Sequence, residues 1–243
     1  MKILNQTRYE YLGRNYRRLK KRGLMFLLVA LVGTVSLLAI IPLLGIIVGG
    51  IFGVIALKNF DEAENFKRGK EGEKAVVNTL QELDDSWWLI NDVKITKKGG
   101  NIDHILLSPK GVFVLEAKNY EGSIRCYQDE WSKRRKRRKR FIPRYFPIES
   151  VSKQARFEAF SLRRLLRMKA KLDIGVVPIC VFTNPEVKLK VIKPRVKVLK
   201  IRHLTKFLQK IKPKQPLSEK ELGLISQCIL EKNRIELKSI NRM

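Results

Sequence analysis

The sequence is poor in cysteine and histidine. Its three cysteines, Cys126, Cys180 and Cys228, are an odd number at wide spacing, which indicates neither a disulfide framework nor a zinc site. The two histidines are His104 and His203, and no G-x-S-x-G elbow or Walker-type phosphate loop is present. Serine-hydrolase and nucleoside-triphosphatase chemistry therefore have little support.

Acidic residues are also scarce. The chain of 243 residues has 23 Asp and Glu against 51 Lys and Arg, a formal net charge of +28. An excess of this size indicates a polyanionic partner, either nucleic acid or an anionic membrane surface. The length suits one sizeable domain with an appendage.

No charged residue occurs from Leu24 to Leu57, which predicts a membrane segment. One continuous helix of this length would measure about 50 Å, against a hydrocarbon core of about 30 Å. Pro42 lies near the middle, so we predict a transmembrane helical hairpin of Leu24–Ile41 and Leu43–Leu57. A second helix could approach closely along Gly45, Gly49 and Gly53. One long tilted span and an uncleaved signal anchor are the alternatives.

Basic residues flank the apolar run on both sides. Residues 1–23 form a basic segment, and residues 58–68 form a linker with Lys58, Lys67 and Arg68. Positive charge on both flanks predicts that both ends of the hairpin, and the domain after it, face the cytoplasm.

The composition from Asp61 onward is typical of a soluble α/β domain. We predict one domain over residues 69–202, an α/β sandwich around a mixed sheet, and a helical extension over residues 203–243. The expected helices are Gly69–Leu83, Glu149–Met168, a short one after Ile201, and Ser218–Lys232. The expected strands are Trp87–Val93, Ile102–Leu107, Val112–Lys118, Ser123–Gln128, Val176–Phe182 and Val196–Ile201.

Charged side chains end the third of these strands. Alternation places Glu116 and Lys118 on one face with Val112 and Val114, and burying them beside a core is costly unless they are paired or bound. A tight hairpin would bring Asp103 close to Glu116. Two carboxylates beside a lysine are able to hold a divalent cation and polarise a phosphate. A surface hairpin with a salt bridge is the alternative reading.

Two helical residues extend this candidate site. Glu73 lies on the apolar stripe of the first soluble helix, although an acid there also complements the helix dipole. Gln154 lies beside the inner face of the second helix.

The loop before that helix contains eight consecutive basic residues: Lys133, Arg134, Arg135, Lys136, Arg137, Arg138, Lys139 and Arg140. Trp131, Phe141, Tyr145 and Phe146 flank this basic run and could stack on bases. Binding to anionic lipid and a solvated loop without a dedicated partner are the alternatives.

From about Phe66 to Leu166 the chain resembles the NERD (nuclease-related) domain of the PD-(D/E)XK nuclease superfamily. The matching residues are Gly69-Lys70-Glu71-Gly72-Glu73, Asn101-Ile102-Asp103-His104, the stretch from Gly111 through Glu116-Ala117-Lys118 to Gly122, Trp131 and Gln154. The basic run departs from the shorter loop of that family.

The resemblance implies a restriction-endonuclease-like mixed sheet flanked by helices, and an Mg2+-dependent (or Mn2+-dependent) endonuclease. Asp103 and Glu116 would ligate the metal, with Glu73 as a further ligand or water-orienting group. Lys118 would activate water and stabilise charge on the phosphate, and Gln154 would orient substrate or water. His104 is expected to point to the opposite face as a structural histidine.

The leading hypothesis is therefore a membrane-anchored, metal-dependent nuclease that acts on nucleic acid, with DNA as the favoured substrate. The alternatives are a membrane-tethered nucleic-acid-binding module without turnover, and a protein that binds anionic lipid surfaces. Metal dependence separates the first hypothesis from the other two.

Overall fold

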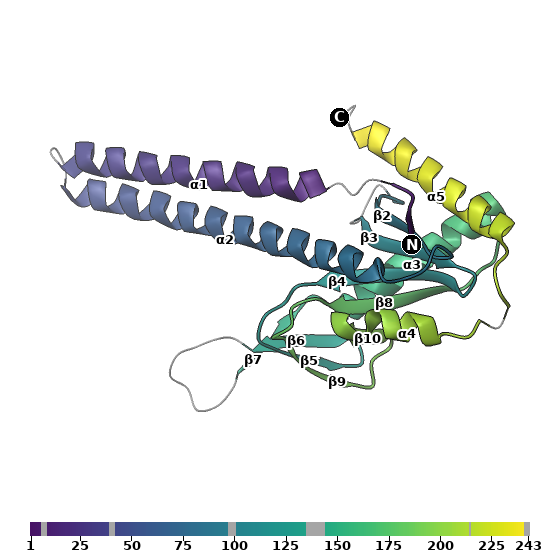
Figure 1. Ribbon diagram of the computed structural model, residues 1–243. Helices are drawn as coiled ribbons and strands as arrows, with labels where there is room; N and C mark the ends of the chain where they lie inside the picture. Colours follow the sequence, from purple (N-terminus) through teal and green to yellow (C-terminus); the bar gives the residue numbers. More distant parts are fainter. Residues whose placement is uncertain (6–8, 39–41, 97–100, 135–143, 214, 241–243) are drawn as a thin grey trace. The chain divides into compact units, whose positions relative to one another are not determined.

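The computed structural model describes residues 1–5, 9–38, 42–96, 101–134, 144–213 and 215–240. The chain divides into two compact units, of which unit 1 comprises Met1–Thr7 with Gly72–Met243 and unit 2 comprises Arg8–Glu71. Figure 1 labels their helices and strands. The chain thus leaves unit 1 after seven residues, forms unit 2, and returns to unit 1 within helix α2 (Pro42–Leu80).

Unit 2 is an antiparallel helical hairpin of α1 (Tyr9–Leu38) and the first part of α2 (Figure 1). The rings of Phe26 and Phe52 stack between the helices with centroids 5.9 Å apart. A Cβ atom at Gly49 would overlap the Thr34 hydroxyl, so glycine permits the close approach there, whereas Gly53 faces open space. The predicted break near Pro42 agrees with the start of α2 at that residue.

The two helices are longer than the sequence pattern predicted. Residues 58–68, predicted as a linker, are helical and continue α2 without interruption. Lys, Glu and Ala, which favour helix, are frequent in this segment, so the loss of apolar character does not end the helix. The end of the predicted first arm, residues 39–41, lies outside the described residues.

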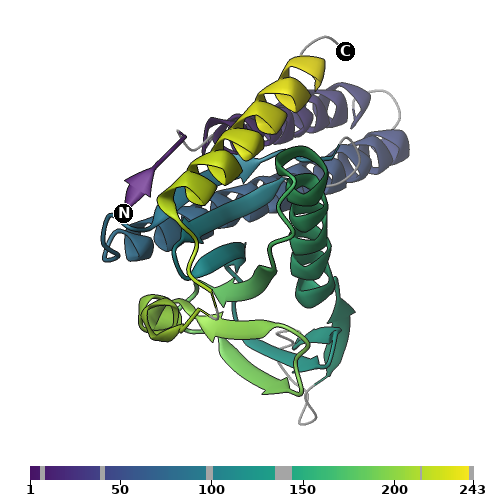
Figure 2. The same cartoon turned by 90° about the vertical axis from the view of Figure 1, so that its right-hand side faces the viewer.

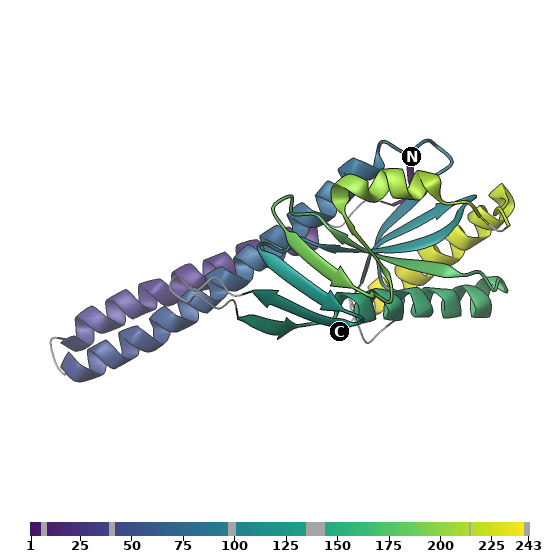
Figure 3. The ribbon, with the colours of Figure 1, turned by 90° about the horizontal axis from the view of Figure 1, so that it is seen from below.

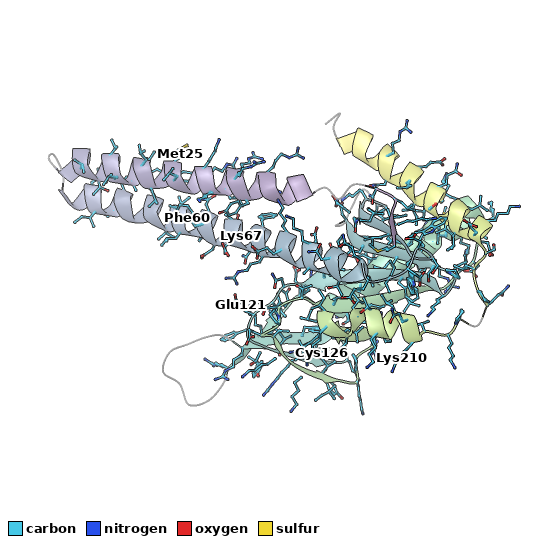
Figure 4. All side chains as sticks on the ribbon, in the orientation of Figure 1. Met25, Phe60, Lys67, Glu121, Cys126 and Lys210 are labelled. Carbon is cyan, nitrogen blue, oxygen red and sulfur yellow. The ribbon has the colours of Figure 1, made fainter. Side chains whose placement is uncertain are left out.

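Large apolar side chains cover the outside of the hairpin. Figure 4 draws the side chains and labels Met25 on α1 and Phe60 on α2. Of the described helices, one, over Leu44–Leu80, is long and apolar enough to cross a membrane. Exposed side chains on the two arms include Leu24, Met25, Leu28, Leu31, Val32, Val35, Ile46, Ile47, Ile51, Val54 and Leu57. An exposed apolar surface of this extent is typical of a membrane or protein interface.

Unit 1 contains, among the described residues, a six-stranded mixed sheet of order β1-β2-β3-β4-β8-β10. The strands β2, β3 and β4 are antiparallel neighbours, whereas β1 is parallel to β2, β8 is parallel to β4 and β10 is parallel to β8. Their bounds are β1 (Lys2–Ile3), β2 (Trp88–Val93), β3 (Ile102–Ser108), β4 (Gly111–Lys118), β8 (Val176–Phe182) and β10 (Lys197–Lys200).

One face of this sheet packs on α3 (Val151–Leu165) and α5 (Glu219–Ile240), which Figure 2 shows against the strands. Alternate strand residues such as Ile105, Val112 and Val114 meet Leu162 and Ile225 in this core. The remaining helical segments are η1 (Leu166–Ala170), η2 (Ile201–His203) and α4 (Leu204–Lys210). Because side chains alternate between the two faces of a strand, the side chains that share a face with Ile105 and Val114 point toward α3.

A second sheet departs from the single sheet that we predicted. Among the described residues it has four strands in the order β7-β6-β5-β9, beside the beginning of α3 (Figure 3). Gly122 has a φ of 82°, which favours glycine, and it turns the chain out of the first sheet after β4. The bounds are β5 (Ser123–Tyr127), β6 (Glu130–Arg134), β7 (Tyr145–Ile148) and β9 (Lys188–Ile192).

The inner face of the second sheet forms its own core. Trp131 is buried there, stacks on Phe182 with ring centroids 5.5 Å apart, and donates from Nε1 to the Ser152 hydroxyl at 2.9 Å. The prediction that Trp131 could stack on bases is therefore wrong, because strand alternation turns it inward. Phe141 lies outside the described residues.

Candidate active site

The strands β3 and β4 bring Asp103 and Glu116 together. Their register pairs His104 with Leu115 and Ile105 with Val114, so Asp103 and Glu116 fall on the face that carries Ile105 and Val114. The Ala117 amide donates to Asp103 Oδ2 at 3.0 Å, which anchors this carboxylate across the strand pair. The hairpin of β3 and β4 thus brings Asp103 close to Glu116, as the sequence pattern predicted.

Glu116 is the most deeply buried acid of this group. Its side chain is 1% exposed, and the Lys118 ammonium forms an ion pair with Oε1. Apart from this ammonium and the neighbouring Glu158 carboxyl, no hydrogen-bonding group of the described residues contacts the Glu116 oxygens. Burial raises the pKa of Glu116 to about 8, the nearby Lys118 lowers it, and the neighbouring Glu158 carboxyl raises it further.

Helix α3 supplies Gln154 and Glu158 to the same place. The side chain of Ser150 caps the helix by accepting a hydrogen bond from the Lys153 amide. Gln154 Oε1 accepts from Lys118 Nζ at 3.3 Å, and Gln154 Nε2 donates to Glu158 Oε1 at 3.1 Å. Gln154 is therefore oriented from both ends and holds the Lys118 ammonium in place.

Glu158 was absent from the sequence prediction. It is buried, and burial raises its pKa to about 7, with a further contribution from Asp103. Its position follows Val151 and Ala155 and precedes Leu162 on the inner stripe of α3. Glu158, like Glu73, is an acidic residue on an apolar helical stripe, so the same sequence signal identifies both residues.

Glu73 also faces this site from the part of α2 that belongs to unit 1. Burial is the main cause that raises the pKa of Glu73 to about 8, and the negative charges of Asp103 and Asp92 also raise it.

Asp92 is a second residue of this site that the sequence prediction did not include. It has a φ of 53°, a strained value for a non-glycine residue, and accepts from Asn101 Nδ2 at 2.5 Å. No sequence pattern signals a left-handed residue inside a strand.

The acids outnumber the cations at this site. Burial raises the pKa of Asp103, and the charge of Glu116 raises it further. Burial disfavours the Lys118 ammonium, but the carboxylates of Glu116 and Asp103 outweigh it and raise the Lys118 pKa. Among the described residues, one ammonium thus faces the four acids Glu73, Asp103, Glu116 and Glu158, an arrangement that favours an additional cation.

The described residues contain no group of three or more His, Cys, Asp or Glu side chains close enough to form a complete metal cage. Mg2+ does not need such a cage, because one or two carboxylates with water and substrate phosphate oxygens suffice. The buried carboxylate of Glu116 beside Asp103 fits this donor set.

His104 lies on the opposite face of β3, as expected. It is fully buried, its Nδ1 lies 2.7 Å from Asn91 Oδ1, and burial lowers its pKa to about 3. A neutral, buried imidazole on the far face of the sheet has a structural role.

The basic run begins on a described strand and continues outside the described residues. Lys133 and Arg134 end β6, whereas residues 135–140 are not described. Lys133 Nζ lies 5.5 Å from the ring centroid of Tyr120, two residues after Lys118 in the chain. The first cation of the run is therefore close to the segment that leaves the candidate active site.

The match to known families agrees with this geometry. Residues 68–183 match the family of the nuclease-related domain, NERD. An uncharacterized protein of Bacillus anthracis is 44% identical over 61 residues, which is 24% of this chain and 29% of that protein. The chain thus covers less than a third of the length of this relative. No solved structure matches the chain.

Proposed function

We propose that this protein is a membrane-anchored, metal-dependent endonuclease that hydrolyses phosphodiester bonds, with DNA as its substrate and Mg2+ or Mn2+ as its cofactor. The observation that carries the proposal is the constellation of Asp103, Glu116 and Lys118 at the ends of two adjacent strands of a nuclease-related domain. A divalent cation would neutralise the buried Glu116 carboxylate and the Asp103 carboxylate beside it.

Each side chain then has a distinct role. Asp103 and Glu116 hold the cation, and Glu73 is a further ligand or orients water. A bound divalent cation lowers the pKa of water and neutralises charge on the phosphate. Lys118, positioned by Gln154, donates to the phosphoryl oxygens as negative charge develops on them. Glu158 holds the amide of Gln154 and so fixes which end of that side chain faces Lys118.

A plasmid-nicking assay of the full-length protein tests this proposal. Supercoiled plasmid is incubated with Mg2+ or with EDTA, using the parent, Glu116→Gln, and Glu186→Gln as a matched control at an exposed position. We expect nicking by the parent and the control with Mg2+ only, and a loss of several orders of magnitude in Glu116→Gln. Equal nicking by Glu116→Gln would refute the assignment and favour a binding module without turnover.

The basic run of Lys133–Arg140 supplies binding in this proposal. Eight cations next to the domain would release counterions from a nucleic-acid backbone and make the affinity strongly dependent on salt. Binding to anionic lipid is the competing role, because unit 2 would hold the run near a bilayer.

We further propose that unit 2 enters the membrane as a two-pass hairpin with both ends in the cytoplasm. The exposed apolar surface of both arms and the basic flanks support this. The pairing of β1 with β2 adds an independent argument, because Lys2 lies opposite Trp88 and Ile3 opposite Leu89. The segments before and after unit 2 belong to one sheet, which supports a hairpin whose two ends open on the same side. A single crossing would separate them.

A further inference from the structure

The outward face of the second sheet carries basic and aromatic side chains that the nuclease proposal leaves unused. Strand pairing places Arg125 and Tyr127 of β5 on the same face as Lys190 and Ile192 of β9 and Tyr145 of β7. The inward positions, Ile124, Cys126 and Trp131, are buried, so the alternation is unambiguous. We call Arg125, Tyr127, Tyr145, Lys190 and Ile192 the outer sheet face.

This face is hollowed. A cavity of about 750 Å³ is lined by the outer sheet face and by Lys153 at the start of α3. Its volume lies within the range of about 300–1,000 Å³ that is typical of ligand pockets. Residues of the candidate active site do not line it, so the hollow is a separate feature of unit 1.

The rings of Tyr127 and Tyr145 line the hollow. Tyr127 is 51% exposed, although an aromatic side chain of this size is normally mostly buried. The Arg125 guanidinium lies 3.8 Å from the centroid of the Tyr145 ring, so the two form a stacked pair. Tyrosine rings and a guanidinium plane are the surfaces on which unpaired bases stack.

The charge of the hollow is complementary to a phosphate backbone. Arg125, Lys153 and Lys190 contribute three exposed cations to its lining, against two acids. One of these acids, Asp129, is already paired with Arg156 at 2.6 Å and with Arg195 at 3.7 Å. Cations interleaved with rings match the alternation of phosphates and bases along a strand.

We propose that the outer sheet face binds single-stranded nucleic acid. In a duplex the bases are stacked on one another and are not free to lie on Tyr127 or on the Arg125–Tyr145 pair. A single strand offers bases and phosphates together. The inference rests on the proposed nucleic-acid substrate but not on cleavage, and it gives the nuclease a second contact with a displaced or unpaired segment.

Fluorescence anisotropy of a labelled 15-nucleotide oligo-dT tests the proposal. The full-length protein is reconstituted in nanodiscs of zwitterionic lipid, and EDTA prevents hydrolysis. Tyr127→Ala should raise the Kd for oligo-dT about tenfold and the Kd for a 15-base-pair duplex less than twofold. Phe160→Ala is the matched control, because Phe160 is 64% exposed on α3 and does not line the hollow.

A second variant keeps the test independent of any folding defect in Tyr127→Ala. Lys190→Ala should weaken oligo-dT binding and reduce its log–log salt slope by about 0.7, whereas the control Lys220→Ala on α5 should change neither. Equal losses for oligo-dT and duplex, or losses no greater than those of the controls, would overturn the proposal. A loss of binding to phosphatidylserine vesicles with unchanged oligo-dT affinity would instead assign the face to lipid.

The outcome is separable from the nuclease proposal. Glu116→Gln should lose nicking and still bind oligo-dT, whereas Tyr127→Ala should bind oligo-dT weakly with its metal-holding carboxylates intact. A parent protein that binds oligo-dT through Tyr127 but never nicks DNA would refute the nuclease proposal alone.

Discussion

Replacing Asp103 by Asn should stabilise the metal-free protein while it removes activity. Burial, and then the charge of Glu116, raises the pKa of Asp103 from an ordinary 3.8 to about 8. The folded state therefore keeps a proton that the unfolded state releases near pH 4, and the free energy of unfolding falls as the pH rises from about 4 to about 8. Asn carries no such proton and still accepts from the Ala117 amide.

The magnitude follows from the size of this pKa shift. One pKa unit corresponds to about 1.4 kcal/mol, so the full shift sets an upper bound of about 6 kcal/mol. Asp103 keeps partial contact with solvent, and burying the Asn amide also costs free energy. We therefore expect the free energy of unfolding to increase by about 2 kcal/mol at pH 8. The gain should vanish well below pH 4, where both states hold the proton.

Urea denaturation in EDTA measures this difference. All three tryptophans, Trp87, Trp88 and Trp131, lie in unit 1, so their emission reports the unfolding of the nuclease-related domain. Asp173→Asn, at an exposed position of unit 1, is the control. A variant that is less stable than the parent at pH 8, or a difference that is the same at pH 5 and pH 8, would refute the reasoning.

Further predictions concern the metal, the lysine, the basic run and the membrane. Mg2+ at 100 times its Kd should stabilise the parent by about 2.7 kcal/mol at pH 8, with little effect on Asp103→Asn in the same urea titration. Lys118→Ala should retain Mg2+ binding by calorimetry, because it removes a competing ammonium, yet lose turnover in the nicking assay. Replacing Lys133–Arg140 by Ser and Gly should weaken duplex binding and flatten its salt dependence, with little change in cleavage at saturating substrate; unchanged DNA affinity with lost vesicle binding would assign the run to lipid. Single cysteines at positions 10 and 65, in a background without the native three, should both resist labelling from outside intact cells; labelling at one position alone would show a single crossing.

The part of the fold that sequence predicted well is the part with strong periodicity. Val176–Phe182 is predicted and observed with the same bounds, because a short apolar run between turn residues has few other solutions. The β3–β4 hairpin follows for the same reason, and with it the approach of Asp103 to Glu116. Residues on regular, alternating strands could therefore be placed from sequence.

The second sheet and the first strand could not be predicted in this way. The inward orientation of Trp131 could not be recognised because Ser132 and then the basic run follow it, and a series of polar residues shows no alternation. Strand β1 has two residues and pairs with a segment more than 80 residues away, so it has no local signal. The strain at Asp92 also arises from tertiary structure and not from local propensity.

The short strand β1 has a consequence for the order in which the protein folds. It is synthesised before unit 2, whereas its partner β2 is synthesised only after the whole of unit 2. A chain in which β1 has not yet paired leaves the edge of β2 open, and an open edge is a template for aggregation. Closure of this edge is therefore a late folding event, because the whole of unit 2 lies between the two strands in the chain.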